Sequence, residues 1–173
     1  MKIELPDAEA TTALGQAIAP LLAAGDSLLL YGPLGMGKST LARGLIRALT
    51  TPDEDVPSPT FTLVQFYESD PPVAHFDLYR LTRPEEAFEI GLDEALDEGC
   101  AVIEWPERLG DDPGRFLGPD QLIIHLSEIK LDAASERPQA DGLREPVDRA
   151  LQGRLATVSG VGRWETGLKD LHV

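Results

Sequence analysis

The alternation of apolar and polar positions predicts a helix, a buried strand and a second helix in the first part of the chain. Asp7 can cap a helix over roughly residues 8–24, and Gly25 can end it. The apolar face of this helix is formed by Leu14, Ile18, Leu21 and Leu22. Residues 27–31 are an apolar run between glycines, which is typical of a buried strand, and residues 39–49 return to helical spacing.

The centre of the chain predicts a β-hairpin. Residues 51–60 contain three prolines and indicate a loop. Residues 61–67 and 73–79 are rich in β-branched and aromatic side chains, and residues 68–72 join them. Because a parallel crossover needs about a dozen residues or more, so short a link favours an antiparallel pair.

The rest of the pattern predicts short elements and one irregular segment. The elements are helical turns over 85–90 and 93–98, a buried strand over 100–104, a short helix or turn over 105–110, strands over 121–126 and 155–158, and a helix over 163–171. Residues 128–149 are polar and unpatterned, which indicates a flexible surface insertion. With 173 residues we expect a single domain over 1–173, an α/β fold whose mixed central sheet carries helices on both faces.

A glycine-rich loop lies between the first predicted strand and the helix that follows it. Residues 32–39, Gly-Pro-Leu-Gly-Met-Gly-Lys-Ser, match the phosphate-binding pattern G-x-x-x-x-G-K-[ST] in its required context. Glycines let the backbone approach phosphate oxygens closely, so the amides of Gly35, Met36 and Gly37 are predicted to surround them. The fold is therefore predicted to be P-loop NTPase-like, with ATP as its ligand.

Three side chains at the end of this loop carry the predicted chemistry. Lys38 would reach the β- and γ-phosphates, the Ser39 hydroxyl would ligate Mg²⁺, and Thr40 would donate to the α-phosphate. The positive end of the helix dipole begins at the same point. We expect Lys38 to lie at the surface, where its replacement would leave the fold intact.

Magnesium needs a carboxylate besides the loop serine, and two candidates follow β-type runs. Glu104 ends one apolar run, and Asp77 lies near the end of another. A carboxylate in such a run is unfavourable unless it meets a cation or hydrogen-bond donors. The alternatives are a strand-end surface acid for Glu104, and a structural hydrogen bond or an ion pair with Arg80 for Asp77.

The loop before the hairpin and the tryptophan after Glu104 have two interpretations each. Thr60 or Thr62 can offer a hydroxyl to the γ-phosphate, its metal or an attacking water, as switch regions do. They can equally be turn and strand threonines. Trp105 is either a core or edge aromatic, or part of a contact surface that responds to the nucleotide. His75, His125, His172 and Cys100 have no metal-ligand spacing and are interpreted as structural.

Charge and composition narrow the class of partner and the compartment. Lys and Arg number 15 and Asp and Glu number 30, so the net charge of −15 disfavours tight direct binding of nucleic acid by this chain alone. It fits either solubility or docking onto a basic protein surface. One cysteine excludes an intramolecular disulfide, and no apolar stretch is long enough to span a bilayer. We therefore expect a cytoplasmic protein with no membrane association.

Several segments together resemble one protein family, in order and in spacing. They are the loop at residues 32–40, Ser58-Pro59-Thr60-Phe61-Thr62, His75-Phe76-Asp77-Leu78-Tyr79-Arg80 and Glu104-Trp105-Pro106-Glu107. This combination is similar to TsaE, the ATPase of bacterial tRNA threonylcarbamoyladenosine biosynthesis. The similarity covers most of residues 5–126 and resumes near residues 153–158.

The resemblance implies a function, partners and further site residues. TsaE acts with TsaD and TsaB in modifying the adenosine beside the anticodon of tRNAs that read codons starting with A. The resemblance implies that Glu104 is the second Mg²⁺ ligand and that Asp77 is needed for hydrolysis. It also implies that Trp105 lies at the boundary between nucleotide and partner. By the same resemblance Thr11 lies near the nucleoside, and Arg154 matches a late nucleotide-contacting arginine.

Three functions remain open at this stage. The first is an ATP hydrolase that is weak alone and activated by its partners, since no obvious arginine finger is present. The second is a small-molecule kinase, which would need a mobile lid with arginines. The available arginines form no lid-like cluster: Arg80, Arg83, Arg108 and Arg115. The third is a nucleotide-gated binding module without useful catalysis.

Overall fold

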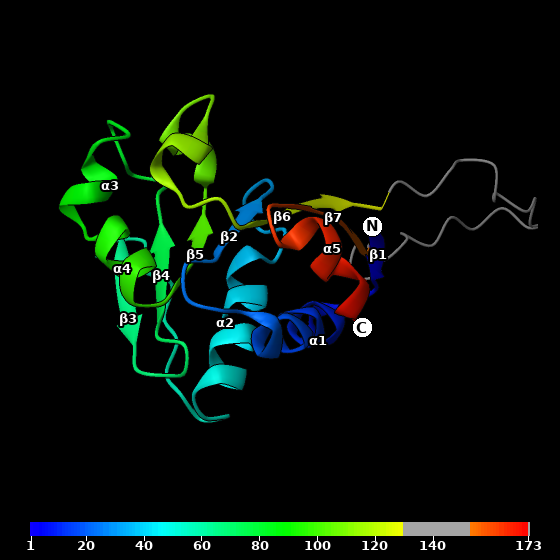
Figure 1. Ribbon diagram of the computed structural model, residues 1–173. Helices are drawn as coiled ribbons and strands as arrows, with labels where there is room; N and C mark the ends of the chain where they lie inside the picture. Colours follow the sequence, from blue (N-terminus) through cyan, green and yellow to red (C-terminus); the bar gives the residue numbers. More distant parts are fainter. Residues whose placement is uncertain (130–152, 173) are drawn as a thin grey trace, which may run out of the picture.

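The computed structural model describes residues 1–129 and 153–172, and it contains one seven-stranded sheet (Figure 1). The strand order is β1-β7-β6-β2-β5-β4-β3. The strands are β1 (Lys2–Leu5), β2 (Ser27–Tyr31), β3 (Val64–Tyr67), β4 (Val73–Asp77), β5 (Cys100–Glu104), β6 (Gln121–Glu128) and β7 (Arg154–Val161). Apart from Glu128, which ends β6, and the residue after it, the predicted insertion at 128–149 lies outside the described residues.

The sheet is mixed, as the sequence predicts. Four central strands are parallel, because β2 pairs with β5 and β6, and β5 pairs with β4. The predicted hairpin is confirmed, since β3 pairs antiparallel with β4. On the other side β7 pairs antiparallel with β6 and β1. The carboxyl ends of the central strands therefore meet at one edge, where α/β sheets bind ligands.

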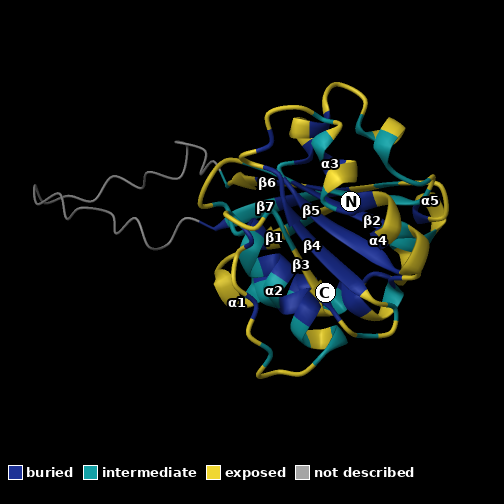
Figure 2. Cartoon of the chain, turned by 90° about the vertical axis from the view of Figure 1, so that its left-hand side faces the viewer, coloured by how far each residue is buried: buried dark blue, intermediate teal, exposed yellow. Residues whose placement is uncertain are grey.

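Helices cover both faces of the sheet and enclose two apolar cores (Figure 2). The α-helices are α1 (Ala8–Ile18), α2 (Lys38–Leu49), α3 (Glu86–Glu89), α4 (Leu92–Glu98) and α5 (Trp164–Gly167), and 3₁₀ turns span Ala19–Leu21, Pro106–Leu109, Pro113–Phe116 and Leu168–Asp170. Side chains alternate between faces along a strand. Leu28 and Leu30 of β2 accordingly pack with α1, α2 and Trp164, whereas Leu29 packs on the face of α3 and α4.

Several element bounds differ from the prediction, and three of the differences have a local physical cause. The strand β1 was not predicted, because four residues of mixed polarity before a helix cap give no strand pattern, and β1 exists through its pairing with β7. The first helix ends at Ile18 and continues as a 3₁₀ turn, since Pro20 cannot donate the next helical hydrogen bond. The hairpin begins at Val64 because a turn precedes it, in which the Leu63 amide donates to the Pro59 carbonyl at 2.7 Å.

None of the helices in the described part of the chain has the length and apolar character that crossing a bilayer requires.

Helices α1 and α2 pack closely where Gly15 of α1 lies against the backbone of α2. A Cβ on Gly15 would lie 2.2 Å from the Leu41 carbonyl oxygen and 2.8 Å from the Leu45 amide nitrogen. Backbone atoms cannot rotate away, so Gly15→Ala is expected to lower the free energy of unfolding by about 3 kcal/mol or more. Thermal unfolding followed by circular dichroism tests this.

A matched control exists in α5. A Cβ on Gly167 would meet its nearest atom, in Trp164, at 3.6 Å, which is ordinary contact. Gly167→Ala is therefore expected to leave the unfolding temperature nearly unchanged. Equal stability of the two variants would contradict the close packing of α1 on α2.

Candidate nucleotide site

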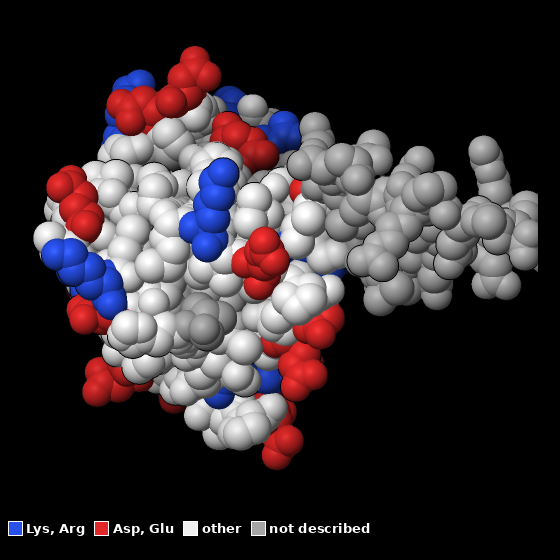
Figure 3. Space-filling view, turned by 90° about the vertical axis from the view of Figure 1, so that its right-hand side faces the viewer, with Lys and Arg blue, Asp and Glu red and all other residues white. Residues whose placement is uncertain are grey.

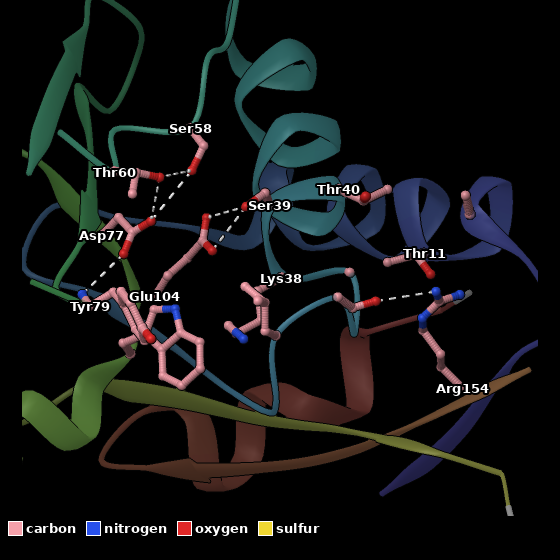
Figure 4. A pocket seen from close by; sticks show the side chains of 15 residues that line it. Thr11, Lys38, Ser39, Thr40, Ser58, Thr60, Asp77, Tyr79, Glu104 and Arg154 are labelled. Atoms are coloured by element: carbon pink, nitrogen blue, oxygen red, sulfur yellow. Dashed lines mark hydrogen bonds between the residues drawn. The ribbon is translucent and has the colours of Figure 1, made fainter. Parts of the chain in front are cut away.

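A cavity of about 340 Å³ lies at the carboxyl edge of the central strands (Figure 4). Most of the predicted site residues line it: Thr11, Gly35, Gly37, Lys38, Ser39, Thr40, Thr60, Asp77, Glu104, Trp105 and Arg154. They come from α1, the loop after β2, α2, the segment between α2 and β3, the ends of β4 and β5 with the residue after β5, and the start of β7. Met36 is the exception, because its side chain packs against the core and its amide donates to the Pro33 carbonyl at 3.3 Å.

The loop between β2 and α2 has the backbone shape that its glycines permit. Gly35 and Gly37 have φ angles of 83° and 99°, in the left-handed region that residues with a Cβ rarely adopt. Gly37 is the residue directly before α2, which begins at Lys38. The unpaired amides of the first helical turn therefore face the cavity, and this is a favourable arrangement for an anion.

Lys38 is buried rather than at the surface, and the prediction of a surface position is wrong. Its exposed fraction is 4%. The ammonium group donates to the carbonyl oxygens of Gly32 and Pro33, the latter at 3.0 Å, and lies 4.0 Å from the centre of the Trp105 ring. Sequence spacing placed Lys38 at a helix start, but it carried no information about the loop carbonyls and the ring that cover it.

Burial and nearby acids act in opposite directions on this lysine. Desolvation lowers the pKa of Lys38 below its ordinary value, and the charges of Glu104, Glu107 and Asp77 partly offset that effect. Two of these acids, Glu104 and Asp77, end strands and line the cavity, whereas Glu107 lies in the turn after β5. Lys38 thus lies close to several acidic side chains, in a cavity where a phosphate would be a further anionic partner.

The side chains of Ser39 and Glu104 contact each other in the wall of the cavity. The Ser39 hydroxyl lies 3.0 Å from both carboxylate oxygens of Glu104, and the Glu104 residue is only 2% exposed. The structure thus excludes the alternative of a surface acid. A hydroxyl and a carboxylate are hard oxygen ligands of the kind that Mg²⁺ prefers. No group of three or more His, Cys, Asp or Glu that could hold a metal occurs among the described residues. This donor set fits a metal that takes its other ligands from phosphate and water.

Asp77 lies beside Glu104 and collects hydrogen bonds from the loop before the hairpin. The two acids are register partners in β4 and β5. Thr60 and Ser58 donate their hydroxyls to Asp77 at 3.2 and 3.4 Å, and the Tyr79 amide donates at 3.1 Å (Figure 4). Asp77 makes no ion pair with Arg80, whose guanidinium instead lies 4.3 Å from the centre of the Phe61 ring.

Trp105 adopts a left-handed backbone conformation, with φ 59°, between β5 and the turn at Pro106–Leu109. Its ring stacks at a tilt on Tyr79, with 4.9 Å between centres, and borders the cavity.

We predict that nucleotide binding changes the fluorescence of Trp105, because Lys38 must leave this ring to reach a phosphate. Trp105→Phe should abolish the change. The other tryptophan, Trp164, is fully buried in the core and serves as the internal control.

Arg154 and Thr11 close the far end of the cavity. Arg154, the first residue of β7, donates from Nη2 to the Gly35 carbonyl at 3.3 Å. A Cβ on Gly37 would lie 3.3 Å from the Thr11 methyl group and 3.8 Å from the Arg154 side chain. Both residues therefore contact the region of the loop, although they are 143 positions apart in the sequence.

Sequence reasoning missed part of the site. Ser58 and Tyr79 line the cavity but carry no spacing signal of their own. His75 was interpreted as structural, yet its Nε2 lies 2.8 Å from Glu104 Oε1. The available signal was the alternation of β4, because residues two apart share a face of the sheet and His75 therefore shares the face of Asp77.

Comparison with known proteins decides the family. The family model described as "Threonylcarbamoyl adenosine biosynthesis protein TsaE" matches residues 5–137. The chain belongs to the TsaE family. A relative from Streptomyces coelicolor is 35% identical over 158 residues, which cover 88% of this chain and 93% of that protein. A relative from Rickettsia felis is 40% identical over 126 residues, covering 72% and 71%. Both are named tRNA threonylcarbamoyladenosine biosynthesis protein TsaE.

The fold resembles that of a solved structure. The crystal structure of Bacillus subtilis YdiB matches with a TM-score of 0.71 and 25% identity, over 99% of this chain and 93% of that chain. The predicted fold class, an α/β P-loop NTPase-like domain, is confirmed by this likeness and by the sheet. TsaE family proteins take part in tRNA threonylcarbamoyladenosine biosynthesis, and a P-loop NTPase-like fold is consistent with nucleotide binding.

Proposed function

We propose that this protein is a magnesium-dependent ATP hydrolase that acts with TsaD and TsaB in threonylcarbamoylation of tRNA. The modified position would be the adenosine beside the anticodon in tRNAs that read codons starting with A. The observation that carries the proposal is the meeting of Ser39, Glu104 and Asp77 at the mouth of a phosphate-binding loop, in a chain of the TsaE family. This chain would contribute one ATPase domain to that assembly.

Each side chain has a distinct role in this proposal. The loop amides and Lys38 bind the triphosphate, and Ser39 and Glu104 hold the magnesium ion, which neutralises charge that develops on the phosphates. Thr40 donates to the α-phosphate. Thr11, Arg154 and Trp105 contact the nucleoside part of the nucleotide at the rim of the cavity. The Asp77 carboxylate accepts a proton from the attacking water or orders that water molecule. Thr60 orients the water or the γ-phosphate.

Exposed apolar side chains around the cavity support activation by a partner. The exposed fractions of Leu34, Phe61 and Tyr79 are 82%, 79% and 46%. Leu34 and Tyr79 line the cavity, and Phe61 follows Thr60 in the chain. Large exposed apolar side chains gathered at one place are typical of protein contacts. A partner seated there would exclude water from the nucleotide and would supply a further cation besides Lys38 and Arg154.

The charge distribution supports docking on proteins rather than tight binding of tRNA by this chain alone. On the face in Figure 3 the basic side chains are scattered and do not form one continuous strip. With a net charge of −15, the average interaction with a nucleic-acid backbone is repulsive. We therefore propose that contact with tRNA is made through the partner assembly.

Nucleoside analysis of tRNA tests the function directly. Cells depleted of the protein should lose threonylcarbamoyladenosine, the wild type should restore it, and Lys38→Ala should not. Purified protein should hydrolyse ATP slowly, and TsaD with TsaB should accelerate it. Unchanged tRNA after depletion, together with a phosphorylated metabolite on incubation with ATP, would favour the kinase. Partner binding that depends on ATP without any turnover would favour the gated binding module.

A further inference from the structure

The buried histidine in β4 makes one polar contact, and that contact is to the magnesium-site carboxylate. His75 has an exposed fraction of 1%, and its Nε2 lies 2.8 Å from Glu104 Oε1. The other ring nitrogen, Nδ1, is buried and has no hydrogen-bond partner among the described residues. Because a carboxylate oxygen is an acceptor, the contact is a hydrogen bond when Nε2 carries a proton.

Packing alone does not account for a histidine at this place. The neighbours on its face of the sheet are apolar, since Val73 and Val102 belong to the same core as Leu28 and Leu30. A polar ring nitrogen left without a partner in such surroundings is unfavourable, and an aliphatic side chain would avoid this cost. The contact with Glu104 is therefore the feature that the imidazole supplies.

The geometry of the two strands explains how the contact forms. β4 and β5 are parallel, with His75 opposite Val102 and Asp77 opposite Glu104. His75 and Glu104 lie on the same face and are diagonal neighbours, within reach of a long side chain. The Ser39 hydroxyl lies 3.0 Å from both Glu104 oxygens. The carboxylate is thus fixed between the ring of one strand and the first turn of α2.

We propose that His75 is a positioning residue for the magnesium site, which it serves by donating from Nε2 to Glu104 Oε1. This inference rests on the proposed magnesium nucleotide function. The hydrogen bond fixes the orientation of the carboxylate before the metal arrives, and Glu104 Oε2 remains directed toward Ser39. Partners that orient a metal-binding carboxylate in this way typically contribute about 10–100-fold to metal affinity.

The test compares magnesium dependence in His75→Leu and His75→Gln. Leucine fills similar space without a donor, whereas the glutamine amide can place a donor near the position of Nε2. The half-saturating Mg²⁺ concentration for ATP hydrolysis should rise about 10–100-fold in His75→Leu and return to within about threefold of wild type in His75→Gln. Mn²⁺ binding in the presence of ADP, measured by electron paramagnetic resonance, should follow the same order.

Two controls separate positioning from a structural role. Binding of ADP in EDTA should be within about threefold of wild type in both variants, because metal-free binding depends on the loop and Lys38. His125→Leu removes the exposed histidine of β6, which stacks on Tyr31 outside the cavity, and should leave the magnesium dependence unchanged. If His75→Leu does not fold, His75→Asn, whose donor is too short to reach Glu104, takes its place.

The outcomes are distinct. Equal magnesium dependence in wild type and His75→Leu would overturn the inference and leave the proposed function in place. Parallel loss of metal-free ADP binding and of thermal stability would also overturn it, since His75 would then be a structural residue. A wild-type protein that binds no magnesium nucleotide at all would contradict the proposed function, and the role of His75 with it.

Discussion

Replacing Lys38 with alanine is expected to weaken the binding of magnesium ATP by roughly a hundredfold. A hydrogen bond to a charged group contributes about 1.5–3 kcal/mol, which corresponds to about 10–150-fold in affinity. The ammonium group now bonds to the carbonyls of Gly32 and Pro33 and lies against Trp105. These contacts hold the ammonium group within the loop that would surround the phosphates. The substitution therefore removes the one cationic side chain that the loop supplies. Calorimetric titration with the nucleotide measures the effect.

The burial of Lys38 makes the choice of variants important. Lys38→Ala also removes a buried aliphatic stem and so is expected to lower the unfolding temperature. Lys38→Met keeps most of the stem and removes the charge, so it isolates the electrostatic contribution. Lys169→Ala removes one charge from an exposed position and serves as the matched control. Wild-type affinity in Lys38→Met would contradict the assignment of this loop to phosphate binding.

Replacing Asp77 with asparagine is expected to reduce kcat for ATP hydrolysis about 100-fold while leaving nucleotide affinity within about threefold. The substitution keeps the shape of the side chain but removes its charge. Asp77 has an exposed fraction of 4% and lies beside Glu104, at the point where Thr60 and Ser58 converge. An acid in this position can accept a proton from water or order it, and an amide cannot do so equally well.

Steady-state hydrolysis in the presence of TsaD and TsaB and calorimetric binding of ADP separate the two effects. Asp97→Asn, an exposed acid of α4, provides the matched control and should behave as wild type. A fall in affinity as large as the fall in kcat would assign Asp77 to binding instead. An unchanged kcat would remove it from the chemistry, and its three hydrogen bonds would then be structural.

Most of the fold could be predicted from local pattern, and the failures have physical causes. The strands β2 and β5 were predicted at their observed bounds, because each is a continuous apolar run bounded by turn residues or a carboxylate. The strand β1 could not be predicted, since its stability comes from pairing with β7, far away in the sequence. The hairpin was predicted from its short link, but its first bound was placed too early because the turn at Leu63 interrupts a β-rich run.

The sequence alone predicted a phosphate-binding role for the glycine-rich loop and a functional role for the two acids. Glycine, lysine and serine at this fixed spacing have few other uses, and a carboxylate ending an apolar run needs a cation or donors. The position of Lys38 and the contact of His75 could be known only from the tertiary structure. Both depend on groups brought together from separate elements, the Trp105 ring after β5 and the Glu104 carboxylate at its end. Local spacing records which residues share a face of a strand or helix, whereas burial and hydrogen-bond partners are set by how those faces pack.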